Sequence, residues 1–223
     1  MASPKIQRAL ISVSDKSNLA DFAKGLVEQG VEIYSTGGTR KHLEDAGLTV
    51  QDISAYTQFP EMMDGRLKTL HPKVFGGILC RHDRDDDMSG IAEHGICSFE
   101  LVVVNLYAFE ETIAKEGVTD VEAIEKIDIG GPSLVRAAAK NHAFTTIATD
   151  PAQYDRILGE VREHGTTTLE TRRDLAGAAF EKTARYDRAI ADYFSRDCGS
   201  DSGVGASEHF PATLSKNLSL IHI

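Results

Sequence analysis

The sequence has few of the residues that hold disulfide-bonded or metal-binding proteins together. Its 223 residues include three cysteines, Cys80, Cys97 and Cys198, and no two of them have CxxC spacing. An odd number of thiols without that spacing indicates reduced cysteines in a cytoplasmic protein, not a disulfide framework or a zinc site. The eight histidines form no HxxxH or HxH pair, so we predict no metal site and no metal cofactor.

The sequence also lacks a long apolar run and an excess of positive charge. No stretch has the length of a signal-peptide core or of a membrane span. The net charge of −10 disfavours nucleic acid as a partner, because nucleic-acid-binding proteins usually present a basic surface. Apolar residues make up 41% of the chain, which is not the composition of a disordered protein. We expect a cytoplasmic globular protein that binds neither membranes nor nucleic acid.

One short segment of this acidic chain, residues 65–79, contains four potential cations: Arg66, Lys68, His71 and Lys73. A buried strand would not carry these charges, and the His-Pro and Gly-Gly pairs argue against a surface helix. We therefore expect an irregular loop that lines a cleft and meets a small anion such as a phosphate ester. The alternative, that these side chains are simply solvated, stays open at this point.

Short apolar runs alternate with helical periodicity along the chain. Strands are predicted at residues 9–14, 31–34, 48–53, 101–105 and 144–148. The alternation predicts an α/β fold: a mostly parallel, Rossmann-like sheet with helices on both faces. Additional C-terminal helices are expected at residues 133–140 and 168–194.

Two loops rich in hydroxyls and small residues follow the first two predicted strands. They are Ser14-Asp15-Lys16 and Thr36-Gly37-Gly38-Thr39. Each loop would precede a helix, so free backbone N–H groups and the positive end of the helix dipole would face an anion. Asn105 ends a predicted central strand on the same edge of the sheet, where ligands of parallel sheets collect.

Six motifs occur in a fixed order: Ser12–Lys16, Ser35–Thr39, Gly65–Pro72, Asn105–Tyr107, Asp128–Gly131 and Ala138–His142. Together they resemble the IMP cyclohydrolase domain of the bifunctional PurH family over roughly residues 6–196, a more specific signal than any one motif. The resemblance implies a methylglyoxal-synthase-like (MGS-like) fold. It also implies an enzyme of purine biosynthesis that closes the ring of 5-formamidoimidazole-4-carboxamide ribonucleotide (FAICAR) to IMP, with loss of water and without a cofactor.

The resemblance further implies the site residues. Lys68, Tyr107, Asp128 and Lys140 match the residues usually assigned to chemistry. The substrate-binding positions are matched by Ser14, Asp15, Lys16, Thr36, Gly37, Gly38, Thr39, Arg66, Thr69, Asn105 and Ile129.

Ring closure needs a proton acceptor, a proton donor and a partner for the oxyanion. We assign Lys68 to the carboxamide, Tyr107 to the formyl oxygen, and Asp128 with Lys140 to proton transfer. Three of them have a structural alternative: Tyr107 as a core aromatic, Asp128 as a helix-capping carboxylate, and Lys140 as a solvated lysine. A straight helix between Asp128 and Lys140 would hold them apart. A homodimer with a shared site, or an early helix end at the alanine-rich stretch, would resolve this.

The composition after Arg196 turns to the glycine and serine of a linker. We predict a cyclohydrolase domain at residues 1–196 and a linker with a truncated tail at 197–223, too short for the transformylase domain that follows in the family. Ring closure without formyl transfer to AICAR is therefore expected. Two alternatives stay open, a methylglyoxal synthase and a non-catalytic nucleotide-sensing MGS-like domain.

Overall fold

The structure is a computed structural model that describes residues 3–106 and 109–197. Residues Met1–Ile190 form one compact unit, and Ala191–Ile223 form a second. The described residues of the second unit are the last residues of helix α10 (Leu169–Asp197).

Five parallel strands form one sheet in the order β3-β2-β1-β4-β5. Their bounds are β1 (Arg8–Ser12), β2 (Glu32–Ser35), β3 (Val50–Asp52), β4 (Leu101–Val104) and β5 (Thr146–Ala148). All four residues of β4 are buried, as expected for a central strand that is covered on both faces. The predicted α/β class and the five strands are confirmed, and strand ends shift by at most two residues.

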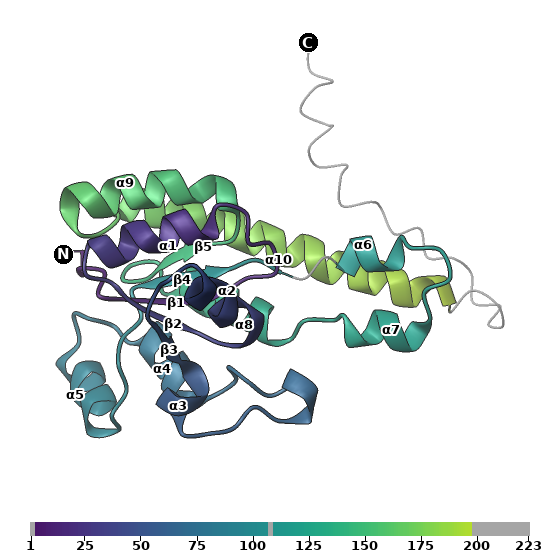
Figure 1. Cartoon of the computed structure of the whole chain (residues 1–223), viewed down its shortest axis with the longest axis horizontal. Helices are drawn as coiled ribbons and strands as arrows, with labels where there is room; N and C mark the ends of the chain where they lie inside the picture. The colour runs from purple at the N-terminus through teal and green to yellow at the C-terminus, as the bar shows by residue number, and fades with distance from the viewer. Residues whose placement is uncertain (1–2, 107–108, 198–223) are drawn as a thin grey trace, which may run out of the picture. The chain divides into compact units, whose positions relative to one another are not determined.

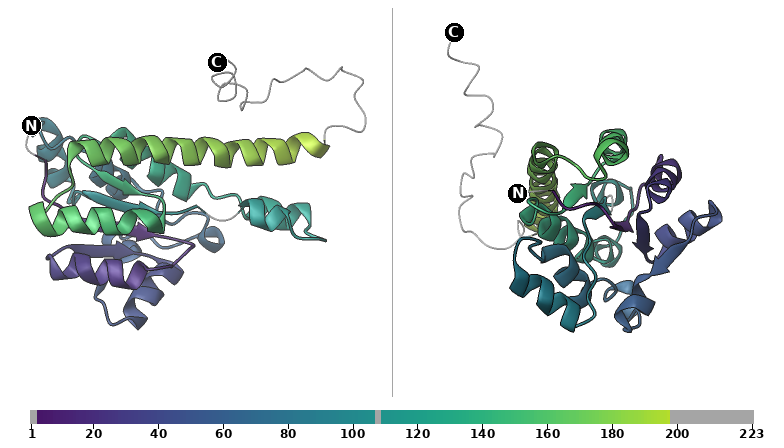
Figure 2. Two further views of the ribbon diagram at one scale, coloured as in Figure 1. Left: turned by 90° about the horizontal axis from the view of Figure 1, so that it is seen from above. Right: turned by 90° about the vertical axis from the view of Figure 1, so that its left-hand side faces the viewer.

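Helices cover both faces of the sheet. Helix α1 (Leu19–Glu28) packs beside α2 (Gly37–Asp45) and α9 (Tyr154–His164), whereas α4 (Pro72–Leu79) packs against α8 (Gly130–Lys140). Figures 1 and 2 show α1 and α9 on one face of the sheet and α4 on the other. The three-layer arrangement follows from the chain direction, because right-handed crossovers put helices on opposite faces when strand order reverses at β1.

Shorter elements complete the fold. They are α3 (Ile53–Thr57), η1 (Met63–Gly65), α5 (Asp85–Glu93), α6 (Phe109–Ile113), α7 (Asp120–Glu125) and η2 (Pro151–Gln153). In Figure 1 the chain leaves β4 for α6 and α7 on the right of the view. Across the residues that the structure describes, no helix combines the length and the apolar character needed to cross a bilayer.

The predicted irregular loop at residues 65–79 is wrong in its second half, because Pro72–Leu79 is helix α4. Pro72 occupies the first turn, where its missing N–H is no loss. The His71 ring caps the helix by accepting a hydrogen bond at Nδ1 from the Lys73 N–H, 3.1 Å away.

The two glycines of α4 serve packing. A Cβ atom on Gly77 would lie 2.2 Å from the Cys97 carbonyl oxygen and 2.8 Å from the Phe99 ring. Only glycine lets the helix approach the segment before β4 this closely. A Cβ atom on Gly76 would lie 3.2 Å from the Ile96 side chain. The Gly-Gly pair therefore marks a close helix contact and not a break in the helix.

Cys80 and Cys97 are free thiols, and Cys198 lies outside the described residues. Burial is the main cause that raises the pKa of Cys80 to about 11. A thiol with so high a pKa is a poor nucleophile at neutral pH, so this cysteine belongs to the packed interior.

Candidate active site

A cleft of about 770 Å³ opens at the carboxyl ends of β1 and β4. These strands are neighbours in the sheet, but after β3 the chain crosses back over β1 to build β4 on its other side. Strand order therefore reverses between them, and the crevice at such a point is where parallel α/β sheets bind ligands. The floor of the cleft comes from Ser12 and Val13 after β1, and from Val104 and Asn105 at β4.

Most of the predicted site residues meet at this cleft. Eleven of them line it: Ser14, Lys16, Thr36, Gly38, Thr39, Arg66, Lys68, Thr69, Asn105, Asp128 and Ile129. Of the other four, Gly37 lies against the Lys68 ammonium. Asp15 lines a neighbouring cleft of about 570 Å³. Tyr107 lies outside the described residues, and Lys140 lines neither cleft.

Asn105 fixes the shape of the loop after β1. Its Oδ1 accepts hydrogen bonds from the backbone N–H groups of Ser14 at 2.6 Å and Asp15 at 3.0 Å. Its Nδ2 donates to the Asp15 carbonyl at 2.8 Å. The Ser17 N–H is bonded to the Asp15 carboxylate, and hydrogen bonds from Ser17 lower the pKa of Asp15. The expectation that this loop offers free N–H groups is therefore wrong for Ser14 and Asp15.

The first turn of α2 is tied to the loop after β1 by one hydroxyl, so residues 37–39 are helical and not the loop that was predicted. Thr39 Oγ1 accepts from the Val13 N–H at 3.1 Å and donates to the Val13 carbonyl at 2.9 Å. Gly37 begins α2 with a φ of +51°, a conformation that favours glycine. The first N–H groups of α2 have no acceptor within the helix. The start of α2 therefore presents a positive helix end, which the sequence predicts after each of the first two strands.

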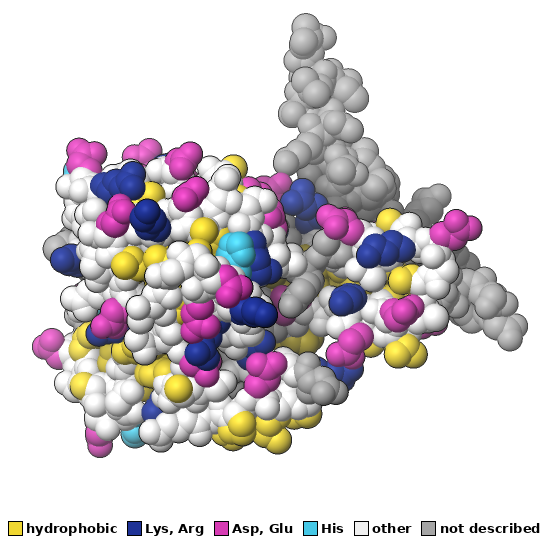
Figure 3. Space-filling model, in the orientation of Figure 1, with side chains coloured by type: hydrophobic (Ala, Val, Ile, Leu, Met, Phe, Trp, Pro, Cys, Tyr) yellow, Lys and Arg dark blue, Asp and Glu magenta, His cyan; other side chains and the backbone are white. Residues whose placement is uncertain are grey.

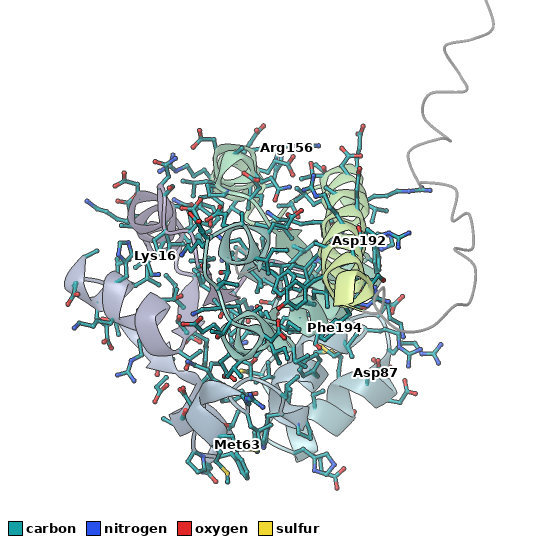
Figure 4. The ribbon with its side chains drawn as sticks, turned by 90° about the vertical axis from the view of Figure 1, so that its right-hand side faces the viewer. Lys16, Met63, Asp87, Arg156, Asp192 and Phe194 are labelled. Atoms are coloured by element: carbon teal, nitrogen blue, oxygen red, sulfur yellow. The ribbon has the colours of Figure 1, made fainter. Side chains whose placement is uncertain are left out.

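A tight hairpin supplies two of the cations of the site, Arg66 and Lys68. Met62 and Leu67 exchange backbone hydrogen bonds of 3.0 and 3.2 Å, and the flanking residues Glu61 and Lys68 face each other. Lys68 Nζ lies 3.2 Å from Glu61 Oε2. We call residues 61–68 the 61–68 hairpin; Figure 4 labels Met63 in it and Lys16 in the loop after β1.

Arg66, from the same hairpin, pairs with the Glu125 carboxylate at the end of α7. Glu61 and Glu125 both line the cleft, and the sequence reasoning missed both. Figure 3 shows Lys and Arg side chains interspersed with Asp and Glu on this face of the molecule. The sequence does not show which carboxylate pairs with which cation. Glu61 is seven residues from Lys68, and Glu125 is 59 residues from Arg66.

Asp128 caps a helix and also lines the cleft. Its Oδ1 accepts a hydrogen bond of 2.8 Å from the Gly131 N–H in the first turn of α8, so the carboxylate caps that helix. It also lines the cleft. Burial raises the pKa of Asp128, although hydrogen bonds from the N–H groups of Gly131 and Gly130 act in the opposite direction. A carboxylate of raised pKa is a stronger base.

Lys140 is the one described residue of the predicted catalytic set that the structure keeps away from the others. Helix α8 is unbroken from Gly130 to Lys140, a rise of roughly 15 Å. The suggested early helix end at the alanine-rich stretch is therefore wrong. Lys140 is exposed at the last position of α8, so it and Asp128 do not meet within one chain.

The other two cations of the 65–79 segment point elsewhere. Lys73 Nζ lies 5.7 Å from the centroid of the Tyr56 ring, and His71 caps α4. Within residues 3–106 and 109–197, moreover, no three His, Cys, Asp or Glu side chains are grouped so that they could hold a metal ion. The site is thus a polar cleft lined by Lys16, Arg66, Lys68 and Lys126, with Lys68 beside the start of α2, and it suits an anionic ligand.

Two family models match this chain. The MGS-like domain matches residues 18–133, and the AICARFT/IMPCHase bienzyme model matches residues 138–221. The chain is 57% identical over 213 residues to the bifunctional purine biosynthesis protein PurH of Rhodopirellula baltica, covering 96% of this chain and 39% of that protein. It is 52% identical over 215 residues to PurH of Bacillus subtilis, covering 96% of this chain and 41% of that protein.

The crystal structure of ForH is also similar, with a TM-score of 0.79 and 36% sequence identity, covering 87% of this chain and all of that one. The chain spans about two fifths of the length of the curated relatives it matches.

Proposed function

Because the chain belongs to the MGS-like family and corresponds to the N-terminal, MGS-like region of the PurH proteins, we propose that it is an IMP cyclohydrolase. It would close the ring of FAICAR by attack of the carboxamide nitrogen on the formyl carbon, with loss of water. The observation that carries the proposal is the meeting of eleven predicted residues at one cleft, at the sheet's switch point. Its volume of about 770 Å³ lies in the range of small-ligand sites.

The 5′-phosphate of the substrate accounts for the cationic side of the cleft. Lys16, Arg66 and the start of α2 supply positive charge and N–H donors to a phosphate. Thr36 and Thr69 add hydroxyls at the same wall. The Ile129 side chain is 61% exposed and lines the cleft, so it offers an apolar surface against which the base can pack.

The reacting end of the substrate lies toward Asp128 in this proposal. The carboxamide nitrogen must lose a proton as it attacks, and the buried Asp128 carboxylate with its raised pKa is the proposed acceptor. The Lys68 ammonium polarises the carboxamide, and Tyr107, which follows Asn105, donates a hydrogen bond to the formyl oxygen. Binding both reacting groups of one molecule in a fixed geometry supplies much of the rate.

Lys140 enters the proposal only through a second subunit. No cation at the end of α8 reaches Asp128 in the same chain, so a proton-transfer role for Lys140 requires a homodimer in which α8 of one copy approaches the cleft of the other. Without that arrangement, Asp128 would exchange its proton with water in the open cleft.

The experiment that tests the function is a spectrophotometric assay of the purified 223-residue chain with FAICAR. We expect conversion to IMP without added metal or cofactor. The same preparation is assayed with dihydroxyacetone phosphate, since the MGS-like family match also fits a methylglyoxal synthase. Methylglyoxal formation without IMP formation would replace the proposal by that alternative. Tight IMP binding without turnover of FAICAR would indicate a nucleotide-sensing domain.

A further inference from the structure

We propose that Glu61 is the resident counter-ion of the cleft, and that an anionic ligand binds by taking the Lys68 ammonium over from the Glu61 carboxylate. This inference rests on the proposed function, because that function supplies a phosphate ester as the ligand. It adds a residue that limits how tightly the ligand is held.

The hairpin geometry brings the two charges together inside the cleft. The Met62–Leu67 backbone pair puts Glu61 and Lys68 opposite each other at the next position of the ladder. Both carboxylate oxygens contact the one ammonium, with Oε1 at 3.3 Å and Oε2 at 3.2 Å. The side chains are 41% and 27% exposed, so water reaches the pair and its opening costs little.

The position of the ammonium explains why a carboxylate is needed there. A Cβ atom on Gly37 would lie only 2.6 Å from Lys68 Nζ, so the charge sits directly against the start of α2. That helix end is itself positive. Two positive features in contact repel each other unless an anion lies beside them, and Glu61 is the anion that the chain provides.

A bound phosphate ester would bring a second negative charge to the same region. Glu61 and the ligand phosphate would then compete for the positive end of α2, because like charges at short range disfavour each other. Glu61 therefore weakens ligand binding while it stabilises the empty cleft.

The Arg66–Glu125 pair is a second instance of this arrangement on the same hairpin. Its side chains are 65% and 50% exposed, more than those of the Lys68–Glu61 pair, so water screens it more strongly. We expect the effect of Glu125 on ligand binding to have the same sign as that of Glu61 and to be smaller.

The test compares Glu61→Gln with a matched control, Glu44→Gln. Glu44 pairs with Arg40 at 2.8 Å on α2 and does not line the cleft, so the control loses the same charge and the same kind of ion pair. Calorimetric titrations with IMP and with inorganic phosphate are carried out at low salt, and thermal melting verifies that both variants are folded. Glu61→Gln is expected to bind IMP about two- to fivefold tighter than the wild type. Glu44→Gln should match the wild type, and the difference should shrink at high salt.

The outcomes separate this inference from the proposed function. If the wild type binds IMP and Glu61→Gln binds it equally or more weakly, the counter-ion role is overturned and the proposed function stands. Equal tightening in Glu44→Gln would assign the effect to net charge and also overturn the role. If no variant binds IMP but phosphate binds more tightly to Glu61→Gln, the counter-ion role holds and the proposed function fails.

Discussion

Replacement of Gly37 by alanine should damage the cleft at the contact between α2 and Lys68. Gly37 has a φ of +51°, and a non-glycine residue in the left-handed region costs about 1–2 kcal/mol. The new Cβ would lie 2.6 Å from Lys68 Nζ, so the ammonium must move away from its place against Glu61. Because a lysine end is flexible, this shift adds little to the backbone strain.

The expected result for Gly37→Ala is a free energy of unfolding lower by about 1–2 kcal/mol, which lowers the melting temperature by about 2–8 °C in a domain of this size. Gly38→Ala is the matched control for stability, since its Cβ meets no atom within 4 Å and its φ is not positive. Alanine there should leave stability unchanged or raise it. Thermal and urea unfolding of the two variants give the comparison. Equal stability of both variants would refute the backbone argument.

Two further predictions concern Asp128 and Lys140. Burial raises the pKa of Asp128, so the folded chain binds a proton more readily than the unfolded chain and stability falls as pH rises between the two pKa values. Asp128→Asn should therefore have a higher melting temperature than the wild type at pH 7 and lose that advantage in acid. Its turnover should fall by about 100-fold or more. A melting difference independent of pH would contradict the pKa argument. Lys140→Ala mixed with Asp128→Asn should recover activity if a homodimer shares the site, whereas full activity of Lys140→Ala alone would end its proposed role.

Local sequence patterns were sufficient for the sheet and for the location of the site. Apolar runs such as the one at β4 identify buried strands without reference to the rest of the chain. Parallel strands place every loop that follows a strand at one edge of the sheet. The sequence therefore predicts Lys16, Thr39 and Asn105 at the same edge.

Contacts between distant segments were the part that the sequence could not supply. Gly76 and Gly77 suggested a break, and only their approach to Ile96 and to the Cys97–Phe99 segment shows why α4 needs glycine. The Asn105 amide bonds to Ser14 and Asp15, about 90 residues earlier in the chain, and this removes N–H groups that were predicted to be free.

The sequence also does not show which of its cations lie in the cleft. The cations of residues 65–79 have similar chemistry in the sequence, yet Lys68 enters the cleft and Lys73 lies over Tyr56. The direction of the Lys68 side chain depends on the 61–68 hairpin, and that of Lys73 depends on the start of α4.

The most direct test of the account compares Lys68→Ala with Lys73→Ala in FAICAR ring closure. The two lysines are five positions apart in one cationic segment, but only Lys68 lines the cleft. We predict a loss of about 100-fold in kcat/KM for Lys68→Ala and a change of less than about threefold for Lys73→Ala, whose half-buried ammonium lies against Tyr56 and not in the cleft. Equal losses in the two variants, or full activity of Lys68→Ala, would contradict the claim that this cleft closes the ring.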